Sequence, residues 1–431
     1  MLMGLRTTTH LAINLLLIIF FSSAIAEAAN EKDFFQFVPD TSGKLSADKL
    51  FPEGRIFCYS FYAVKDDDIL EKIKRDGFTA VGPYYGGDIE KTLDFAEKAG
   101  LPALHSIGLP MDFHAEEPLE ISNEEIVKQI KEQVLKVVDS DKVMWWYIQP
   151  EEIRFWCPKE MEYLQLAADT IRENDPMKRP VWMYSPNHRT DEHLAHTIKH
   201  LDICGKGFYA GFSGHRYKRI WIKWSIDQEV AAIKNANPDA IPISVTEMFF
   251  QPEPEELPLI PKWVRHDCYL SLIGGTKGFV TFLGKRRPKD FPAYDLYYEA
   301  YAQVGRELNG EAKLADVFLF GKRMDDLKVT PIIGPSRLAL RYQFKDNEYS
   351  SVNFADIAYK DRRFLFAVNS ANEAVTAEVS GIPTKDVIAE DKFNENKQLE
   401  LDLEEGKMIL EFDALEAKCI VFKQQEVSPG R

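Results

Sequence analysis

Two short segments of the chain place acidic side chains where an apolar run ends. The first, Trp145–Glu152, closes on Glu151 and Glu152, and the second, Ile243–Phe250, contains Glu247. An apolar strand seldom holds a carboxylate that has neither a partner nor a function. Two carboxylates that share a cleft can divide the roles of proton donor and nucleophile or base. Hydrolysis of a glycosidic bond needs such a pair.

These segments belong to a regular series of strand-like and helix-like runs. Strands are expected at 55–63, 78–85, 101–109, 143–148, 180–184, 201–209, 241–249 and 278–282. Helices are expected behind them at 66–76, 88–99, 122–138, 158–174, 191–200, 221–236, 262–273 and 293–308. The third of these helices opens with Ser122-Asn123-Glu124-Glu125, which has the spacing of a capping box.

Eight strand–helix units predict an α/β protein with a parallel sheet. Cys58 and Val280, on the first and last strands, are 222 residues apart. That is about 32 residues per unit, as in a (β/α)8 (TIM) barrel of ~250 residues. The alternative is a doubly wound open sheet, which normally has a glycine-rich loop after its first strand. Because the segment 59–65 has no glycine, we predict a barrel over residues 55–314.

In such barrels the active site forms at the carboxyl ends of the strands. Glu151 and Glu152 follow the fourth expected strand, and Glu247 lies at the end of the seventh. Glu152 and Glu247 are 95 residues apart, which is close to three units. We therefore expect them at the same face of the barrel.

The periodicity of apolar residues changes after about residue 315. Short β-rich runs separated by turns replace the helical pattern, at 338–344, 364–368, 375–379, 399–403, 408–412 and 419–422. This pattern predicts a small antiparallel β-sandwich over residues 315–424. Residues 29–54 are expected to form a lead-in segment, and residues 425–431 a polar tail.

The first 28 residues have the form of a secretory signal peptide. Arg6 precedes an apolar run over 11–21, and small residues around Ala26 and Ala28 offer a cleavage site. An uncleaved anchor is the alternative, but the run is shorter than the ~20 residues that span a bilayer. We expect a secreted or periplasmic protein without membrane attachment after cleavage. The net charge of −15 argues against nucleic acid as a partner.

Metal and cofactor motifs are not evident in the sequence. The five cysteines are scattered, and no Cys/His group has the spacing of a zinc site. At most one disulfide is expected, and no metal or cofactor. A metal held by His105 and acidic neighbours would instead indicate a barrel hydrolase or lyase of another chemistry.

A barrel with glutamates at the ends of strands four and seven resembles the large clan of retaining (β/α)8-barrel glycoside hydrolases. The resemblance implies that Glu152 is the acid/base, that Glu247 is the nucleophile, and that Tyr209 near the end of strand six bonds the nucleophile. The clan usually has Asn before the strand-four glutamate, whereas this chain has Glu151 there, preceded by Pro150. Glu151 therefore stays the alternative acid.

Other side chains near strand ends are candidates for binding a carbohydrate. Asn187 and His188 follow strand five and could hold sugar hydroxyls, while Tyr85 closes strand two. His105 lies in strand three and is equally well interpreted as a core histidine. Trp146 is a candidate because sugar rings stack on aromatic planes, although most tryptophans are expected in the core.

Structural explanations remain open for the acidic residues. Glu151 and Glu152 could serve the following helix as N-terminal charges, and Glu247 could form an ion pair with Arg265. Our leading expectation is an exported glycoside hydrolase that cleaves a poly- or oligosaccharide by a retaining double displacement. The alternative is a non-catalytic glycan-binding protein on a glycosidase-like barrel.

Overall fold

The computed structural model describes residues 57–84, 89–109, 121–282, 291–385 and 387–424. The expected signal peptide, the lead-in segment, Tyr85 and the polar tail lie outside these ranges.

Eight parallel strands close into a barrel in the order β1 to β8, with β1 paired to both β2 and β8. This confirms the predicted (β/α)8 barrel. The strands are β1 Cys58–Phe61, β2 Ala80–Val81, β3 Ala103–Gly108, β4 Val143–Gln149, β5 Val181–Ser185, β6 Ile203–Phe208, β7 Ile241–Glu247 and β8 Gly278–Phe282.

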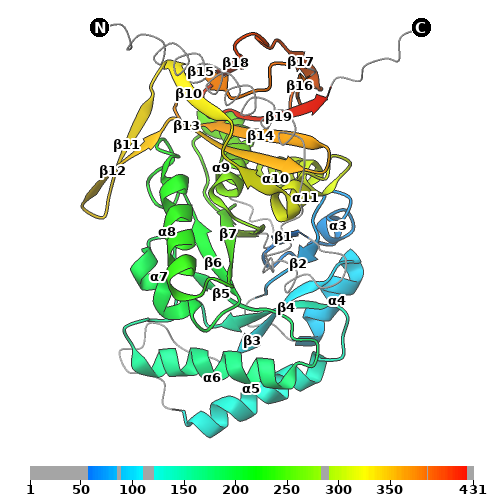
Figure 1. Cartoon of the computed structure of the whole chain (residues 1–431). Coiled ribbons are helices and arrows are strands. Elements are labelled where there is room, and N and C mark those ends of the chain that lie inside the picture. The colour runs from blue at the N-terminus through cyan, green and yellow to red at the C-terminus, as the bar shows by residue number, and fades with distance from the viewer. Residues whose placement is uncertain (1–56, 85–88, 110–120, 283–290, 386, 425–431) are drawn as a thin grey trace, which may run out of the picture.

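Helices surround the barrel, and most begin and end close to the predicted positions (Figure 1). At the start of α5 the Ser122 hydroxyl accepts a hydrogen bond from the Glu125 amide at 3.2 Å, as the capping spacing predicts. The helices are α3 Asp67–Leu70, α4 Ile89–Ala99, α5 Asn123–Val137, α6 Pro158–Asn174, α7 Asp191–Ile198, α8 Trp221–Ala236, the 3-10 helix η1 Pro254–Leu259, α9 Ile260–Gly274, α10 Tyr294–Asn309 and α11 Leu314–Phe320.

Antiparallel sheets follow the barrel, which confirms the predicted β-sandwich. A six-stranded sheet has the order β17-β16-β19-β14-β13-β9, and a three-stranded sheet has the order β10-β15-β18. Side chains from both sheets share one apolar core. The strands are β9 Lys322–Met324, β10 Lys328–Ile333, β13 Val352–Tyr359, β14 Arg362–Asn369, β15 Val375–Ser380, β16 Val387–Asp391, β17 Lys397–Leu399, β18 Lys407–Phe412 and β19 Ala417–Gln424.

A separate hairpin, β11 Arg337–Tyr342 and β12 Lys345–Ser350, extends from these sheets. It lies alongside α8 (Figure 1), where Tyr342 contacts Trp224 with ring centroids 4.5 Å apart.

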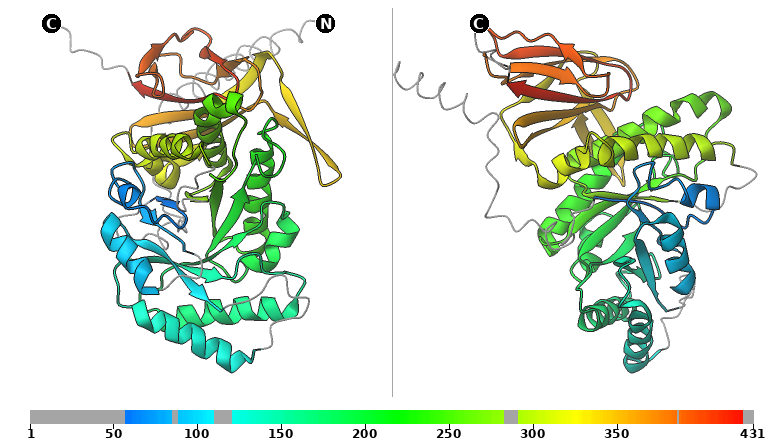
Figure 2. Two further views of the ribbon diagram at one scale, coloured as in Figure 1. Left: turned by 180° about the vertical axis from the view of Figure 1, so that it is seen from behind. Right: turned by 90° about the vertical axis from the view of Figure 1, so that its right-hand side faces the viewer.

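The sandwich packs on one side of the barrel, against α9 and α11, and α5 and α6 lie on the far side (Figure 1, Figure 2). The Phe318 and Phe366 rings meet at 4.3 Å between centroids. Polar groups also cross the boundary, since His266 Nε2 lies 3.0 Å from Ser370 Oγ. Because α11 is buried at this boundary, packing with the sandwich accounts for a short helix that the sequence pattern did not predict.

The five cysteines are all free thiols, so the one disulfide that seemed possible is not formed. Within the described ranges, no helix is both long enough and apolar enough to cross a membrane.

The α6–β5 turn contains a buried ion pair, and a hydrogen bond joins this pair to β4. Asp175 is completely buried and accepts hydrogen bonds from Trp146 Nε1 at 2.7 Å and from Arg179 Nε at 3.0 Å. Arg179 also donates to the main-chain oxygen of Val138 at 2.7 Å, at the end of α5. One carboxylate thus anchors the loop, the strand and the guanidinium.

Replacing Asp175 with Ala should lower the free energy of unfolding by about 3–5 kcal/mol, because it leaves the Arg179 charge buried and unpaired. Asp169→Ala, on the exposed face of α6 just before this turn, is the matched control and should change stability by no more than about 0.5 kcal/mol. Urea unfolding of both variants measures the difference. Equal midpoints would show that the network contributes little.

Candidate active site

Aromatic side chains gather inside the carboxyl end of the barrel, which we call the mouth. Tyr62, just after β1, meets Phe282 of β8 at 5.0 Å between ring centroids. Phe282 lies 6.0 Å from Tyr209, and Tyr209 lies 6.0 Å from Tyr184 of β5. These residues alternate with outward-facing neighbours along their strands, so the rings project into the barrel.

Two glycines of β6 make room for these rings. A β-carbon at Gly205 would lie 2.7 Å from the Trp182 ring, and one at Gly207 would lie 2.6 Å from the Tyr184 hydroxyl. Such distances are far below van der Waals contact. Gly205 and Gly207 therefore leave the space inside the barrel that the large side chains of β5 occupy.

Glu247 ends β7 at this mouth and is 8% exposed. Its carboxylate accepts hydrogen bonds from two successive amides of the β6–α8 loop, from Gly211 N to Oε2 and from Phe212 N to Oε1, both at 2.8 Å. Its main-chain oxygen accepts a hydrogen bond from the Tyr301 hydroxyl at 2.8 Å. Both the side chain and the backbone of Glu247 are thereby fixed.

Burial raises the pKa of Glu247 to about 7, although the Phe212 and Gly211 amides and the Arg219 charge oppose the shift. Arg219 itself pairs with Asp267, at 2.9 Å from Nε to Oδ1. The proposed structural partner, Arg265, binds Glu307 instead. An ion pair with Arg265 therefore does not explain the charge at the end of β7.

Glu151 reaches the same mouth from β4. Its Oε1 accepts a hydrogen bond from the Tyr62 hydroxyl at 2.6 Å and another from the Tyr147 hydroxyl. The Tyr62 ring contacts Phe282, and Phe282 pairs in register with Glu247 across β8 and β7. The same pair of aromatic rings therefore links the two carboxylates at the mouth.

Glu152 is placed differently from its neighbour. It is exposed, and its φ of 61° lies in the left-handed region that non-glycine residues rarely adopt. Burial chiefly raises the pKa of Tyr184, and the charges of Glu151 and Glu152 add to that effect. Both glutamates are thus close to the mouth, and Glu151 is the one held by tyrosine hydroxyls.

Three further predicted residues lie around the mouth. The Tyr209 ring stands edge-on to Phe249 at 5.1 Å, and its hydroxyl bonds that of Tyr184. Asn187 is buried and donates from Nδ2 to Ser213 Oγ at 2.6 Å, which ties the loops after β5 and β6 together. His188 is exposed beside it.

His105 and Trp146 are not brought to the mouth. They face outward, where their rings meet edge-on at 5.8 Å and Trp146 binds Asp175. Neither ring nitrogen of His105 has a hydrogen-bond partner among the described residues, and burial, with a contribution from Arg179, lowers its pKa to about 4. His105 is thus a core histidine. No three His, Cys, Asp or Glu side chains of the described segments gather to hold a metal ion.

The tyrosines that hold Glu151 and the amides that hold Glu247 were not among the residues predicted from the sequence. Tyr62 and Tyr147 carried a usable signal, because each occupies an inward position of an expected strand near its end. The amides of Gly211 and Phe212 carried none, since any residue could supply a backbone N–H.

No family model matches the sequence, and no curated protein matches it. Solved structures share its fold. An AmyP variant in complex with maltotriose superposes with a TM-score of 0.54 at 11% identity, over 90% of this chain and 100% of that one. The noncanonic maltogenic alpha-amylase AmyB from Thermotoga neapolitana gives 0.52 at 12% identity, over 84% and 97%. The alpha-amylase from Geobacillus thermoleovorans complexed with acarbose gives 0.51 at 10% identity, over 83% and 91%.

The chain shares its barrel fold with these proteins. At these identities the similarity concerns the fold.

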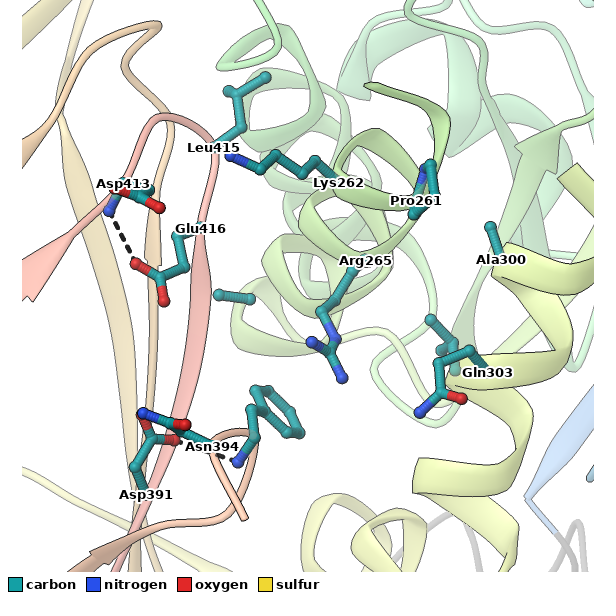
Figure 3. Close-up of a pocket in the computed structure, with 13 residues that line it drawn as sticks. Pro261, Lys262, Arg265, Ala300, Gln303, Asp391, Asn394, Asp413, Leu415 and Glu416 are labelled. Carbon is teal, nitrogen blue, oxygen red and sulfur yellow. Dashed lines mark hydrogen bonds between the residues drawn. The ribbon is translucent and has the colours of Figure 1, made fainter. Parts of the chain in front are cut away.

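A hollow of about 450 Å³ lies between α9, α10 and the C-terminal sheets (Figure 3). Arg265 lines it and stands over the Phe393 ring at 4.4 Å. Asp391, Asp413 and Glu416 line the opposite wall. None of the glutamates at the strand ends lines this hollow, so it is separate from the mouth.

The stability of the protein should reveal the raised pKa of Glu247. Between about pH 4.5 and 7 the native state keeps a proton on Glu247 that the unfolded chain releases, so this group makes stability fall as pH rises. A glutamine at this position cannot titrate. The difference in unfolding free energy, Glu247→Gln minus wild type, should therefore increase by up to about 3 kcal/mol as the pH is raised from about 4.5 to 7.

Denaturant unfolding at several pH values measures this difference, with exposed Glu152→Gln as the control. Parallel curves for wild type and Glu247→Gln would show that the carboxyl titrates normally.

Proposed function

We propose that the protein is an exported glycoside hydrolase that cleaves a poly- or oligosaccharide with retention of anomeric configuration. The observation that carries this proposal is the placement of Glu151 and Glu247 around one cluster of aromatic rings at the mouth. The N-terminal segment supports export. The neighbours of the same fold include proteins whose complexes hold maltotriose and acarbose, which fits a carbohydrate substrate.

The proposed mechanism uses the two carboxyls in turn. Glu247 attacks the anomeric carbon while the β4 acid protonates the departing oxygen, which gives a glycosyl-enzyme intermediate. Water then attacks this intermediate, and the β4 carboxylate takes its proton. The Gly211 and Phe212 amides orient the nucleophile, and the rings of the mouth pack against the C–H faces of the sugar.

We assign the acid/base role to Glu151, although the family resemblance alone favoured Glu152. The Tyr62 and Tyr147 hydroxyls hold Glu151 in a fixed orientation inside the mouth, and positioned proton transfer requires such orientation. The exposed Glu152 lies at the margin and could still affect the local field.

A non-catalytic glycan-binding protein is the second candidate. Both oxygens of Glu247 already accept hydrogen bonds from the β6–α8 loop. In this second candidate, the role of the Glu247 carboxylate is to anchor the loop, and it takes no part in a reaction. Binding of oligosaccharide without turnover, unchanged in Glu247→Gln, would favour this candidate.

A panel of glycans should separate the possibilities. Removing the acid or the nucleophile should lower kcat/KM by about 10²–10⁴-fold, so we expect this loss for Glu151→Gln and for Glu247→Gln. Glu152→Gln is the matched control and should stay within about threefold. NMR of the first product should show retained configuration.

The opposite results have distinct meanings. A loss confined to Glu152→Gln would move the acid/base role to Glu152. Activity of Glu247→Gln within tenfold of wild type would exclude Glu247 as nucleophile, and an inverted product would exclude the double displacement.

The pH dependence of kcat/KM tests the role of Glu247 independently. A nucleophile must be ionised, and the pKa of Glu247 is raised to about 7. We therefore expect kcat/KM to fall about tenfold per pH unit below about pH 7. An aryl glycoside with a good leaving group should keep this acid limb, because it needs little help from the acid. A fall above pH 7 instead would identify Glu247 as the proton donor.

A further inference from the structure

Exposed aromatic rings in this protein concentrate at the mouth of the barrel. Among the described residues, four aromatic side chains are more than half exposed: Trp156 at 66%, Phe212 at 66%, Tyr217 at 55% and Phe344 at 97%. Exposed aliphatic side chains lie elsewhere, for example Leu135 on α5 and Ile333 on β10. The rings are therefore not part of a general apolar surface.

Three of these rings come from successive positions around the mouth. Trp156 lies in the segment between β4 and α6, and Phe212 lies in the loop between β6 and α8. Phe344 lies at the tip of the β11–β12 hairpin, which reaches the loop after β5. Since β4, β5 and β6 are adjacent in the barrel, the segments that carry or contact these three rings follow one another around this end of the barrel.

The hairpin tip is fixed by contacts with the barrel. Gln343 donates from Nε2 to the His188 main-chain oxygen. Next to it, the Tyr342 ring meets Trp224 at 4.5 Å and His215 at 5.2 Å. Phe344 is therefore presented at a defined place, although its own ring is almost entirely in solvent.

The backbone of the tip is unfavourable for the residues that occupy it. Gln343 and Phe344 have φ values of 48° and 61°, a conformation in which hairpin turns favour Asn and Gly. A bulky aromatic residue there is disfavoured by the turn itself. Residues held in such disfavoured conformations cluster at functional sites.

Phe212 connects the rim to the candidate nucleophile. Its amide donates to Glu247 Oε1 at 2.8 Å, and its ring lies 5.6 Å from that of Phe249. A sugar seated against Glu247 would therefore border the Phe212 ring. Trp156 belongs to the segment after β4, and Phe344 to the hairpin that contacts the loop after β5.

We propose that Trp156, Phe344 and Phe212 form a track on which successive sugar units of an extended polysaccharide stack. This inference rests on the proposed function and makes the enzyme one that acts within long chains. Each ring comes from a different segment. Polar residues lie nearby, with Arg216 on the loop of Phe212 and His188 on the loop that the hairpin tip contacts. Isolated rings among polar groups suit stacking with sugars, whereas protein partners usually bury contiguous apolar patches.

The decisive variant is Phe344→Gly, because it removes the ring and relieves the backbone at once. We expect its melting temperature to equal or exceed that of wild type, while its affinity for polysaccharide falls by about three- to tenfold. Affinity electrophoresis in gels containing laminarin, xylan or starch measures binding for whichever polymer retards wild type. Phe344→Trp should restore binding, and Ile333→Ala should leave it unchanged.

Hydrolysis of a short aryl glycoside should stay within about twofold in Phe344→Gly, since Phe344 is 97% exposed and belongs to the hairpin, whereas Glu151 and Glu247 belong to the barrel. Unchanged polysaccharide binding in this variant would overturn the track. So would sedimentation showing that the ring instead mediates self-association of the protein.

The two proposals can fail separately. Ring-dependent binding without hydrolysis of any glycan would refute the hydrolase and retain the track. Hydrolysis by wild type with no effect of Phe344→Gly on long substrates would retain the hydrolase and refute the track.

Discussion

The fit between β5 and β6 inside the barrel is the constraint on which the candidate site depends. Trp182 and Tyr184 can occupy the interior only because Gly205 and Gly207 face them without side chains. This packing brings the Tyr184 ring beside Tyr209 and, through Phe282, toward Tyr62. A larger residue at either glycine of β6 would displace the rings that lie beside the two carboxylates.

The environment of Glu247 combines two opposing influences. Enclosure by apolar rings disfavours its charge, and amide hydrogen bonds and the Arg219 field favour it. The net result is a carboxyl that changes protonation near neutral pH instead of near 4.5. Such intermediate behaviour is common where a group must exchange a proton or attack during a reaction. The same amide bonds join the end of β7 to the β6–α8 loop, so chemistry and loop position are coupled at one residue.

Much of the fold could be predicted from the sequence, because the spacing of strands and helices follows from a repeated unit. The position of Glu247 at a strand end followed from the same spacing. The inward or outward direction of single residues was harder, since a one-residue shift in register reverses it. Trp146 and Tyr147 are adjacent, yet the first packs under the helices and the second holds Glu151. The hairpin tip could not be inferred at all, because Phe344 reaches the barrel through contacts between segments more than a hundred residues apart.

The boundary between barrel and sandwich has a further consequence. His266 bridges Ser370 of the sandwich and Asp267, and Asp267 holds Arg219, whose charge acts on Glu247. A line of polar contacts thus runs from the C-terminal sheets to Arg219, whose charge acts on Glu247 at the mouth. The sandwich is therefore not an interchangeable appendage. A barrel produced without the sandwich would expose the apolar surface of α9 and α11 and would leave His266 open to water. The electrostatics of the mouth would then change, although no residue of the mouth had been altered.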